Sequence, residues 1–282
     1  MQYSLRTVEA IAQKTIPFPV KLFLRKLNWR FFYLNLKIRN FARGRKTSPK
    51  VFCPISETFF DEFVPLFKAY DPGLSTCEQP RISPDSGARD GLRLQWLYLK
   101  NETELFKSNI RLLHFGPEYG FYKRFITMDN IRYFPVDKNN RKYSRDVGYA
   151  DLAGLDFQTD AFDMIICNHI LEHVDDDKQA IREMYRVLKP GGTAIITVPI
   201  DHSRSRSHED ASITNPKDRE REFGQWDHLR YYGLDFHQKL ASKGFTVKTV
   251  YYAKTFSSED VAKFGLVNEP VFVCQKPLIQ NE

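Results

Sequence analysis

The stretch FDMIICNHILEHVDDD, residues 162–177, decides the fold class of this 282-residue chain. Its first six residues, Phe162–Cys167, form an apolar run of strand length. The three aspartates that end it precede a helical pattern over 176–188, where acids cap a helix and complement its dipole. A Lys-Pro-Gly-Gly turn then leads into a second apolar run, Thr193–Val198. A buried strand, a helix and another buried strand predict a parallel sheet that helices cover on both faces.

The same alternation extends outward in both directions. Further apolar runs of strand length occur at Ile110–Phe115, Ile131–Val136, Phe245–Tyr252 and Val271–Cys274, and helical patterns occur at 90–106, 119–127 and 233–243. The predicted fold class is therefore α/β, with a Rossmann-like doubly wound sheet. No helix is expected between the last two runs, so these strands are predicted to pair antiparallel at the edge of the sheet.

Composition and charge exclude several classes of protein. Hydrophobic residues make up 42% and charged residues 27% of the chain, which is typical of a globular protein. There is no apolar run long enough to span a membrane, and the N-terminus lacks the apolar stretch of a signal peptide. The four cysteines form no CxxC pair and no disulfide framework; they are Cys53, Cys77, Cys167 and Cys274. A cytoplasmic location is predicted.

The positive charge belongs to a basic amphipathic arm, residues 1–50. This arm holds twelve lysines and arginines and one acid, whereas the remaining 232 residues carry a small net negative charge. Apolar residues recur every three or four positions after Pro19, which predicts a helix whose stripe lies within residues 20–43. Two roles stay open: docking on the body of the protein or on a second copy, and peripheral contact with the inner face of a membrane. Because no nucleic-acid motif accompanies the charge, nucleic acid is not an expected partner.

Glycines and polar residues follow the ends of the predicted strands, where doubly wound sheets bind ligands. The first strand ends in LLHFGPEYG, in which Gly116 and Gly120 let the backbone approach a ligand closely. Asp137 ends the second strand, about 20 residues later, where an acid can accept two hydrogen bonds from a ribose diol. Asn168 and His169 emerge from the end of the third.

On these residues the chain resembles the class I S-adenosylmethionine-dependent methyltransferases. The resemblance covers residues 105–275 and depends on FDMIICNHILEHVDD, REMYRVLKPGG and the strand TAIITVP. It implies a seven-stranded sheet, S-adenosylmethionine as cofactor and a methyltransferase domain at 105–282. In that family the methionine part of the cofactor lies over the glycine turn, the ribose meets the acid of the second strand, and the adenine lies near Asp151 and Leu152.

The glycine turn departs from the general acid-x-Gly-x-Gly-x-Gly pattern of the family. His114 stands in place of the acid and Glu118 in place of the middle glycine. A bacterial subgroup of the family has a similarly altered turn and an FGQWDHLRYYG-like segment downstream. The cofactor-binding set that the resemblance implies is His114, Gly116, Glu118, Gly120, Asp137, Asp151, Leu152, Asn168 and His169.

The same subgroup resembles the segment 51–104, where it carries a zinc knuckle of two CxxC pairs before a helix. Here Cys53 and Cys77 are kept, but Ser56 replaces one cysteine and Ser86 occupies the final position. Two thiolates rarely hold a structural zinc ion, so no metal is predicted for this segment. The retained cysteines are expected to be buried apolar residues.

A long polar stretch, residues 200–232, is predicted to be an acceptor loop or lid, because compact domains rarely have connections of this length. Its dense cluster of polar and aromatic side chains, WDHLRYY, argues for an ordered wall over disorder. A hydroxyl acceptor must lose a proton, which a histidine can take. The candidate catalytic residues are His173 and His228, with Asp227 orienting the latter.

The predicted function is methyl transfer to a small polar acceptor, and the subgroup resemblance suggests a hydroxyl of a glycan or glycan precursor. One alternative is a catalytically inactive binding or scaffold protein of the same fold, which the altered glycine turn would fit. A remote alternative is a zinc protease, because HILEH, residues 169–173, matches H-x-x-E-H. That motif needs a helix, whereas this stretch directly follows a strand. A nicotinamide dehydrogenase is disfavoured because G-x-G-x-x-G is missing.

Overall fold

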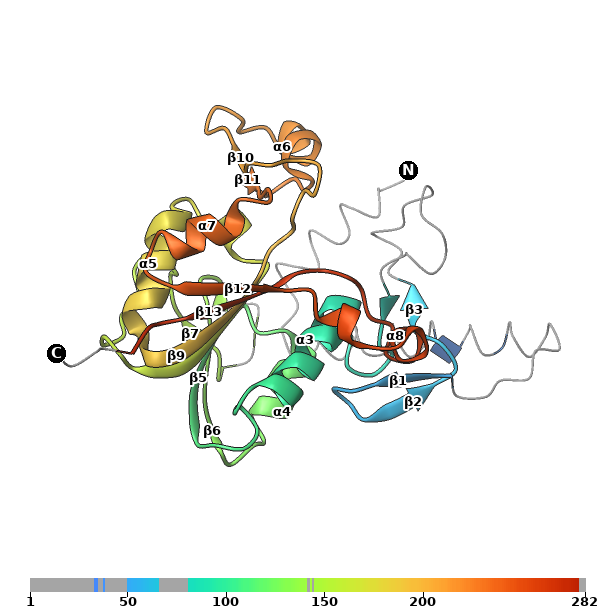
Figure 1. Cartoon of the computed structure of the whole chain (residues 1–282). Helices are drawn as coiled ribbons and strands as arrows, with labels where there is room; N and C mark the ends of the chain where they lie inside the picture. Colours follow the sequence, from blue (N-terminus) through green and yellow to red (C-terminus); the bar gives the residue numbers. More distant parts are fainter. Residues whose placement is uncertain are drawn as a thin grey trace.

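A seven-stranded sheet forms the centre of the protein (Figure 1). The computed structural model describes residues 33–34, 38, 50–65, 81–140, 143 and 145–278. The strand order is β12-β13-β9-β8-β5-β6-β7. The strands are β5 (Ile110–Phe115), β6 (Ile131–Asp137), β7 (Gly148–Tyr149), β8 (Phe162–Asn168), β9 (Leu188–Thr197), β12 (Thr246–Val250) and β13 (Val271–Gln275). The pairs β12–β13 and β13–β9 are antiparallel and the other four pairs are parallel, so the predicted α/β doubly wound sheet is confirmed.

Helices and short turns of helix connect these strands. They are α3 (Asp90–Glu102), α4 (Tyr119–Phe125), η3 (Leu171–His173), α5 (Asp177–Val187), α6 (Pro216–Phe223), α7 (Phe236–Ala241), η4 (Tyr252–Thr255) and α8 (Ser258–Phe264). Asp176 caps α5 by accepting a hydrogen bond from the Gln179 N–H at 2.8 Å, which confirms the capping role predicted for this aspartate run.

The prediction that no helix separates the last two strands is wrong, although their antiparallel pairing is confirmed. Both η4 and α8 lie between β12 and β13. Ser257 caps α8 by accepting a hydrogen bond from the Asp260 N–H, and Gly265 ends it in the left-handed conformation. These two capping residues were the local signal for a helix too short to show a clear apolar period.

The two faces of the sheet carry separate apolar cores. Along β8, Ile165 and Cys167 point into the core under α5 and α7, whereas Met164 and Ile166 point into the core under α3 and α4. The second core also takes in the segment before α3, through side chains such as Ile55. Figure 1 shows β1 and β2 beside α3.

The segment before α3 contains a hairpin of β1 (Val51–Cys53) and β2 (Thr58–Phe60), and a second small pair of β3 (Val64–Pro65) and β4 (Arg81–Ile82). Cys53 is fully buried, and its Sγ lies 3.5 Å from Ser86 Oγ. The prediction that Cys53 is a buried residue is confirmed. Cys77 lies outside the described residues.

Most of the basic arm lies outside the described residues. Three of its residues, Tyr33, Leu34 and Ile38, are helical. The Tyr33 ring contacts Phe60 edge-on, and its hydroxyl accepts a hydrogen bond from the Asp61 N–H, so this point of the arm touches the body of the protein. Within the described part of the chain, no helix combines the length and apolar character that crossing a membrane requires.

Candidate functional site

The glycine turn between β5 and α4 depends on the missing side chain of Gly116. Its φ is +58°, in the left-handed region, and an added Cβ would lie 2.7 Å from Ile170 Cδ1. The same Cβ would lie 3.6 Å from a carboxylate oxygen of Asp137. The turn therefore faces the acid at the end of the neighbouring strand β6, as the sequence analysis expects.

Asp137 and Asp151 are placed differently around this turn. Asp137 is buried, and it accepts hydrogen bonds from the Asn139 N–H at 2.6 Å and the Tyr143 hydroxyl at 3.2 Å. Asp151 lies after β7 and pairs with Lys138 at 2.8 Å, a hydrogen bond that lowers the pKa of Asp151. Leu152, beside it, is buried in the core under α5.

Glu118, one of the two departures from the glycine pattern, bridges two strand ends. Its carboxylate lies 2.9 Å from Nε2 of the buried His114 on β5, and accepts a hydrogen bond from the Asn168 amide at 3.0 Å at the end of β8. Asn168 in turn exchanges two amide hydrogen bonds of 2.7 Å with Gln95 of α3. Gln95 was not among the predicted site residues, because nothing in its local sequence points to a residue 73 positions away.

Gly120 lies apart from this network. It sits in the first turn of α4, and a Cβ added there would lie 3.5 Å from Ile55 and 3.6 Å from Ser86. It therefore packs against the segment before α3. Gly116, Glu118, Asp137 and Asn168 lie around the ends of β5, β6 and β8, whereas Asp151 and Leu152 follow β7.

Arg230 anchors the end of the 200–232 loop to the turn after β8. This loop is ordered: it contains α6 and a pair of strands, β10 (His208–Glu209) and β11 (Arg230–Tyr231). The buried guanidinium of Arg230 donates to the carbonyls of Leu171, Val174 and Asp175 and to the Glu209 carboxylate. The loop is thus tied to the main chain of the turn after β8.

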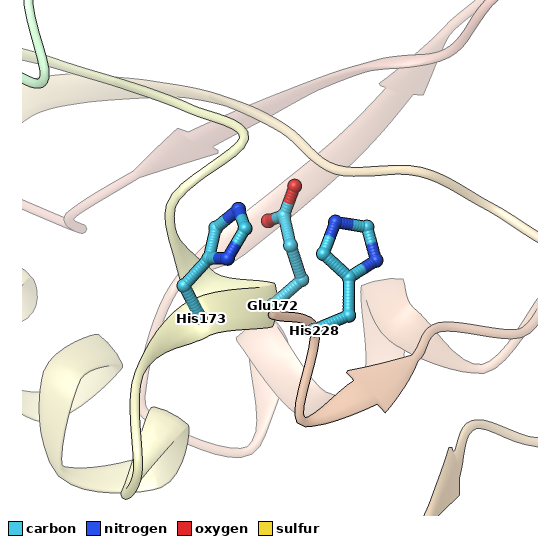
Figure 2. A group of neighbouring side chains, drawn as sticks. All are labelled: Glu172, His173 and His228. Atoms are coloured by element: carbon cyan, nitrogen blue, oxygen red, sulfur yellow. The ribbon is translucent and has the colours of Figure 1, made fainter. Parts of the chain in front are cut away.

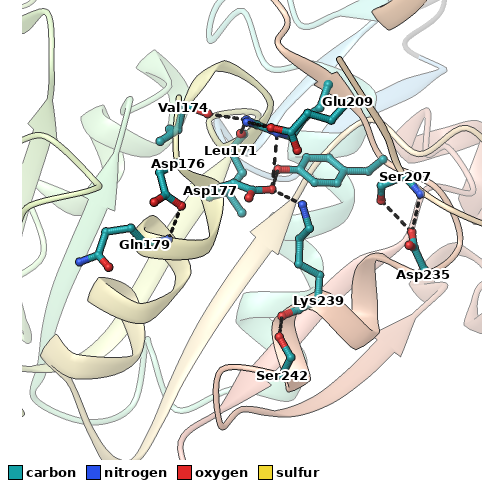
Figure 3. A network of polar contacts seen from close by, with 12 residues as sticks. Leu171, Val174, Asp176, Asp177, Gln179, Ser207, Glu209, Asp235, Lys239 and Ser242 are labelled. Carbon is teal, nitrogen blue, oxygen red and sulfur yellow. Dashed lines mark hydrogen bonds and ion pairs between the residues drawn. The ribbon is translucent and has the colours of Figure 1, made fainter. Parts of the chain in front are cut away.

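A second set of buried contacts reinforces this anchor (Figure 3). Asp177, at the start of α5, accepts hydrogen bonds from the Tyr232 hydroxyl and from Lys239. Arg230 and Tyr232 belong to the cluster that was predicted to contact the acceptor. In the structure both are buried, and they hold the loop in place. Trp226 is exposed.

This anchoring places His228 against η3. The Leu229 N–H donates to the Glu172 carbonyl at 2.8 Å, and the His173 and His228 rings meet edge to face with centroids 4.8 Å apart. Figure 2 shows the Glu172 carboxylate between the two imidazole rings. Asp227 lies on the outer side of His173, with its carbonyl 3.2 Å and its carboxylate 3.6 Å from Nδ1. It thus orients His173, whereas the sequence analysis paired it with His228.

Burial governs the electrostatics of this group. Desolvation lowers the pKa of His228, which keeps its imidazole neutral near pH 7. His169 has a left-handed backbone with φ of +51°, and its Nδ1 lies 3.4 Å from Glu172 Oε1.

Because Leu171–His173 is a single 3-10 turn, HILEH does not form the helix that a zinc protease motif requires.

The predicted residues thus form two neighbouring groups. The first surrounds the glycine turn and Asp137, and the second is the group formed by Glu172, His173 and His228, called the histidine cluster below. Ile170 joins them, since it lies over Gly116 and is two residues before Glu172. Glu172 was not among the predicted site residues; its place next to His173 was the signal that could have found it.

Comparison with known proteins matches residues 118–196 to the family model described as a methyltransferase domain. Among solved structures, an S-adenosylmethionine-dependent methyltransferase from Mesorhizobium loti is 16% identical, covering 64% of this chain and 96% of its own, with a TM-score of 0.43. A phosphoethanolamine N-methyltransferase from Haemonchus contortus is also 16% identical, over 66% of this chain and 52% of its own, with a TM-score of 0.42. The [4+2]-cyclase SpnF is 19% identical, over 66% and 80%, with a TM-score of 0.42.

Proposed function

Because the chain carries a methyltransferase domain, we propose that it transfers a methyl group from S-adenosylmethionine to a small polar acceptor, a hydroxyl of a glycan or glycan precursor. The observation that carries the proposal is the match of residues 118–196 to this domain, together with a glycine turn that faces a buried acid at the adjacent strand end. We assign the catalytic unit to residues 105–282, with 200–232 as its acceptor loop.

The residues around the turn fit the cofactor chemically. Gly116 places the Asp137 carboxylate beside the turn, where it offers acceptors for ribose hydroxyls. Glu118 adds a second carboxylate, which is about one-third exposed and favours a positively charged ligand. When bound, S-adenosylmethionine supplies a methyl group that is activated by the positive charge on sulfur.

The histidine cluster is the proposed acceptor side of the site. The Nδ1 atoms of His173 and His228 lie within hydrogen-bond distance of the Asp227 and Phe223 carbonyls, so in the neutral imidazole each Nδ1 donates there and Nε2 carries no proton. An Nε2 in this state can accept a hydroxyl proton. His173 is partly exposed, so an acceptor can reach the cluster from solvent. The larger part of catalysis is to hold the acceptor and the methyl group in line. Well-oriented reactants gain about 7 to 11 kcal/mol in this way.

The first test of this proposal is calorimetric titration with S-adenosylmethionine and S-adenosylhomocysteine. We expect both to bind one per chain, and Asp137→Asn to weaken binding by about tenfold to a hundredfold, because a hydrogen bond to a charged acceptor is lost. Asp156→Asn, an exposed aspartate in the loop before β8, is the matched control and should bind like the wild type. A folded protein that binds neither compound would contradict the proposal.

Turnover is the second test, measured as release of S-adenosylhomocysteine in the presence of glycan acceptors. We expect His228→Ala to lower turnover at least tenfold while leaving cofactor affinity nearly unchanged, since it acts on the acceptor. Cofactor binding without turnover on any polar acceptor would favour the inactive binding protein of the same fold.

A further inference from the structure

The histidine cluster has the composition of a metal site. Glu172, His173 and His228 each offer one ligand atom, and the three atoms lie within 4.8 Å of one another (Figure 2). They come from two segments, η3 and the stretch around His228, which the Arg230 anchor holds together. We propose that these three side chains bind one divalent transition-metal ion, with zinc as the ion that best matches two imidazoles and one carboxylate.

The state of the Glu172 carboxylate is the strongest support. The side chain is 2% exposed, and neither of its oxygens accepts a hydrogen bond from any residue that the structure describes. The half-exposed His169 ring has its Nδ1 3.4 Å from Oε1, an ion-pair distance without hydrogen-bond geometry. A buried carboxylate is costly unless it is paired and hydrogen-bonded. A bound cation would satisfy both oxygens at once.

The two histidines are already in the form that binds metal. Each directs Nδ1 to a backbone carbonyl, His173 to Asp227 at 3.2 Å and His228 to Phe223 at 2.9 Å. This arrangement fixes the tautomer that leaves the Nε2 lone pair available, as in metal sites whose ligating histidines donate their other N–H to a carbonyl or carboxylate. The Asp227 carboxylate, at 3.6 Å from His173, adds negative charge behind that ring.

The spacing of the three ligand atoms suits an ion after a small adjustment. Metal bonds of about 2.0–2.2 Å place tetrahedral ligand atoms roughly 3–3.5 Å apart, so rotation of the partly exposed His173 side chain must close the remaining distance. Three protein ligands leave one coordination position free, and the exposure of His173 opens that position toward solvent. This is the pattern of a catalytic rather than a structural zinc site.

Metal binding stands independently of methyl transfer, whereas a role for the ion in catalysis rests on the proposed function. An acceptor hydroxyl on the free coordination position would have a lowered pKa and would lose its proton to solvent water. Its oxygen would then form the new C–O bond as the C–S bond of the donor breaks and a neutral thioether leaves. In this form of the reaction, the histidines hold the ion and do not take the proton.

The test is calorimetric titration of the full-length chain with Zn²⁺ alone, after removal of bound metal by a chelator, with cofactor affinity and melting temperature measured on each sample. We expect the wild type to bind one Zn²⁺ per chain at this site. Glu172→Gln keeps the shape of the side chain and should weaken binding at least a hundredfold, and His173→Ala should do the same. His237→Ala, at an exposed histidine of α7 outside the cluster, is the control and should bind like the wild type.

The alternative outcomes are clear. No Zn²⁺ binding by a folded wild type would overturn the proposal, and so would equal binding by wild type, Glu172→Gln and His173→Ala, because the ion would then sit elsewhere, for example on cysteines. Cofactor binding that persists in either case would leave the proposed function intact. If Glu172→Gln does not fold, His173→Ala decides, since this side chain is partly exposed.

Discussion

Two places in this molecule can be compared as candidate zinc sites: the hairpin around Cys53 and the histidine cluster. They differ in the chemistry of their side chains. Beside α3, the hairpin residue Cys53 lies next to Ser86, so a thiol meets a hydroxyl there. At the histidine cluster, a buried carboxylate lies between the imidazoles of His173 and His228. Hydroxyls are weak ligands for zinc, whereas imidazole and carboxylate are strong ones. The segment before α3 is thus held by apolar packing, whereas the histidine cluster brings together groups that bind zinc.

The largest expected effect would come from adding three thiolates to the first place, around Cys53. The spacing Cys53-x-x-Ser56 recurs as Ser83-x-x-Ser86, and the hydroxyls of Ser56 and Ser83 are buried without a hydrogen-bond partner among the described residues. We expect the triple variant with cysteine at the three serines to bind one more Zn²⁺ than the wild type. Structural zinc sites have apparent binding free energies of about 10–16 kcal/mol, so the melting temperature should rise with zinc.

The control for this gain is a triple variant with cysteine at three exposed serines, Ser203, Ser212 and Ser242. It adds the same number of thiols, and it should gain no tight zinc. Uptake measured by elemental analysis after gel filtration distinguishes the two. Equal uptake by both variants, or none by the first, would mean that the hairpin does not bring the four positions together.

A smaller effect is expected from Arg230→Met, which would disrupt the histidine cluster and leave the segment around Cys53 unchanged. Removing the guanidinium leaves three backbone carbonyls and the buried Asp177 carboxylate with fewer partners. We expect the free energy of unfolding to fall by about 3–5 kcal/mol, measured by urea denaturation. Arg204→Met removes an exposed ion pair of the same loop and should cost less than about 0.5 kcal/mol. Similar losses for both variants would show that Arg230 does not anchor the loop.

The smallest effect is expected from Cys53→Ala. If Cys53 acts only as a small apolar side chain, its truncation should lower the free energy of unfolding by about 1 kcal/mol. The loss should be the same with and without a chelator. A loss that disappears when the chelator is added would instead show that Cys53 holds a metal ion in the wild type.

The fold could be predicted because its signals are local. The alternation along β8 assigns Ile165 and Ile166 to opposite faces of the sheet, and the glycine turn and Asp137 fall at strand ends by sequence order alone. What could not be predicted depends on contacts between distant residues. Glu172 is exceptional only because the turn after β8 buries it, and Gln95 matters only because α3 packs against the strand ends.

The amide pair of Gln95 and Asn168 has a practical consequence for where the protein can be cut. A chain shortened to begin at residue 105 would retain all seven strands, yet it would strip one face of the sheet of α3 and expose apolar side chains such as Leu112 and Met164 to water. It would also remove both Gln95 hydrogen bonds from the Asn168 amide at the end of β8. The smallest stable and soluble version of this protein therefore extends well before its sheet begins.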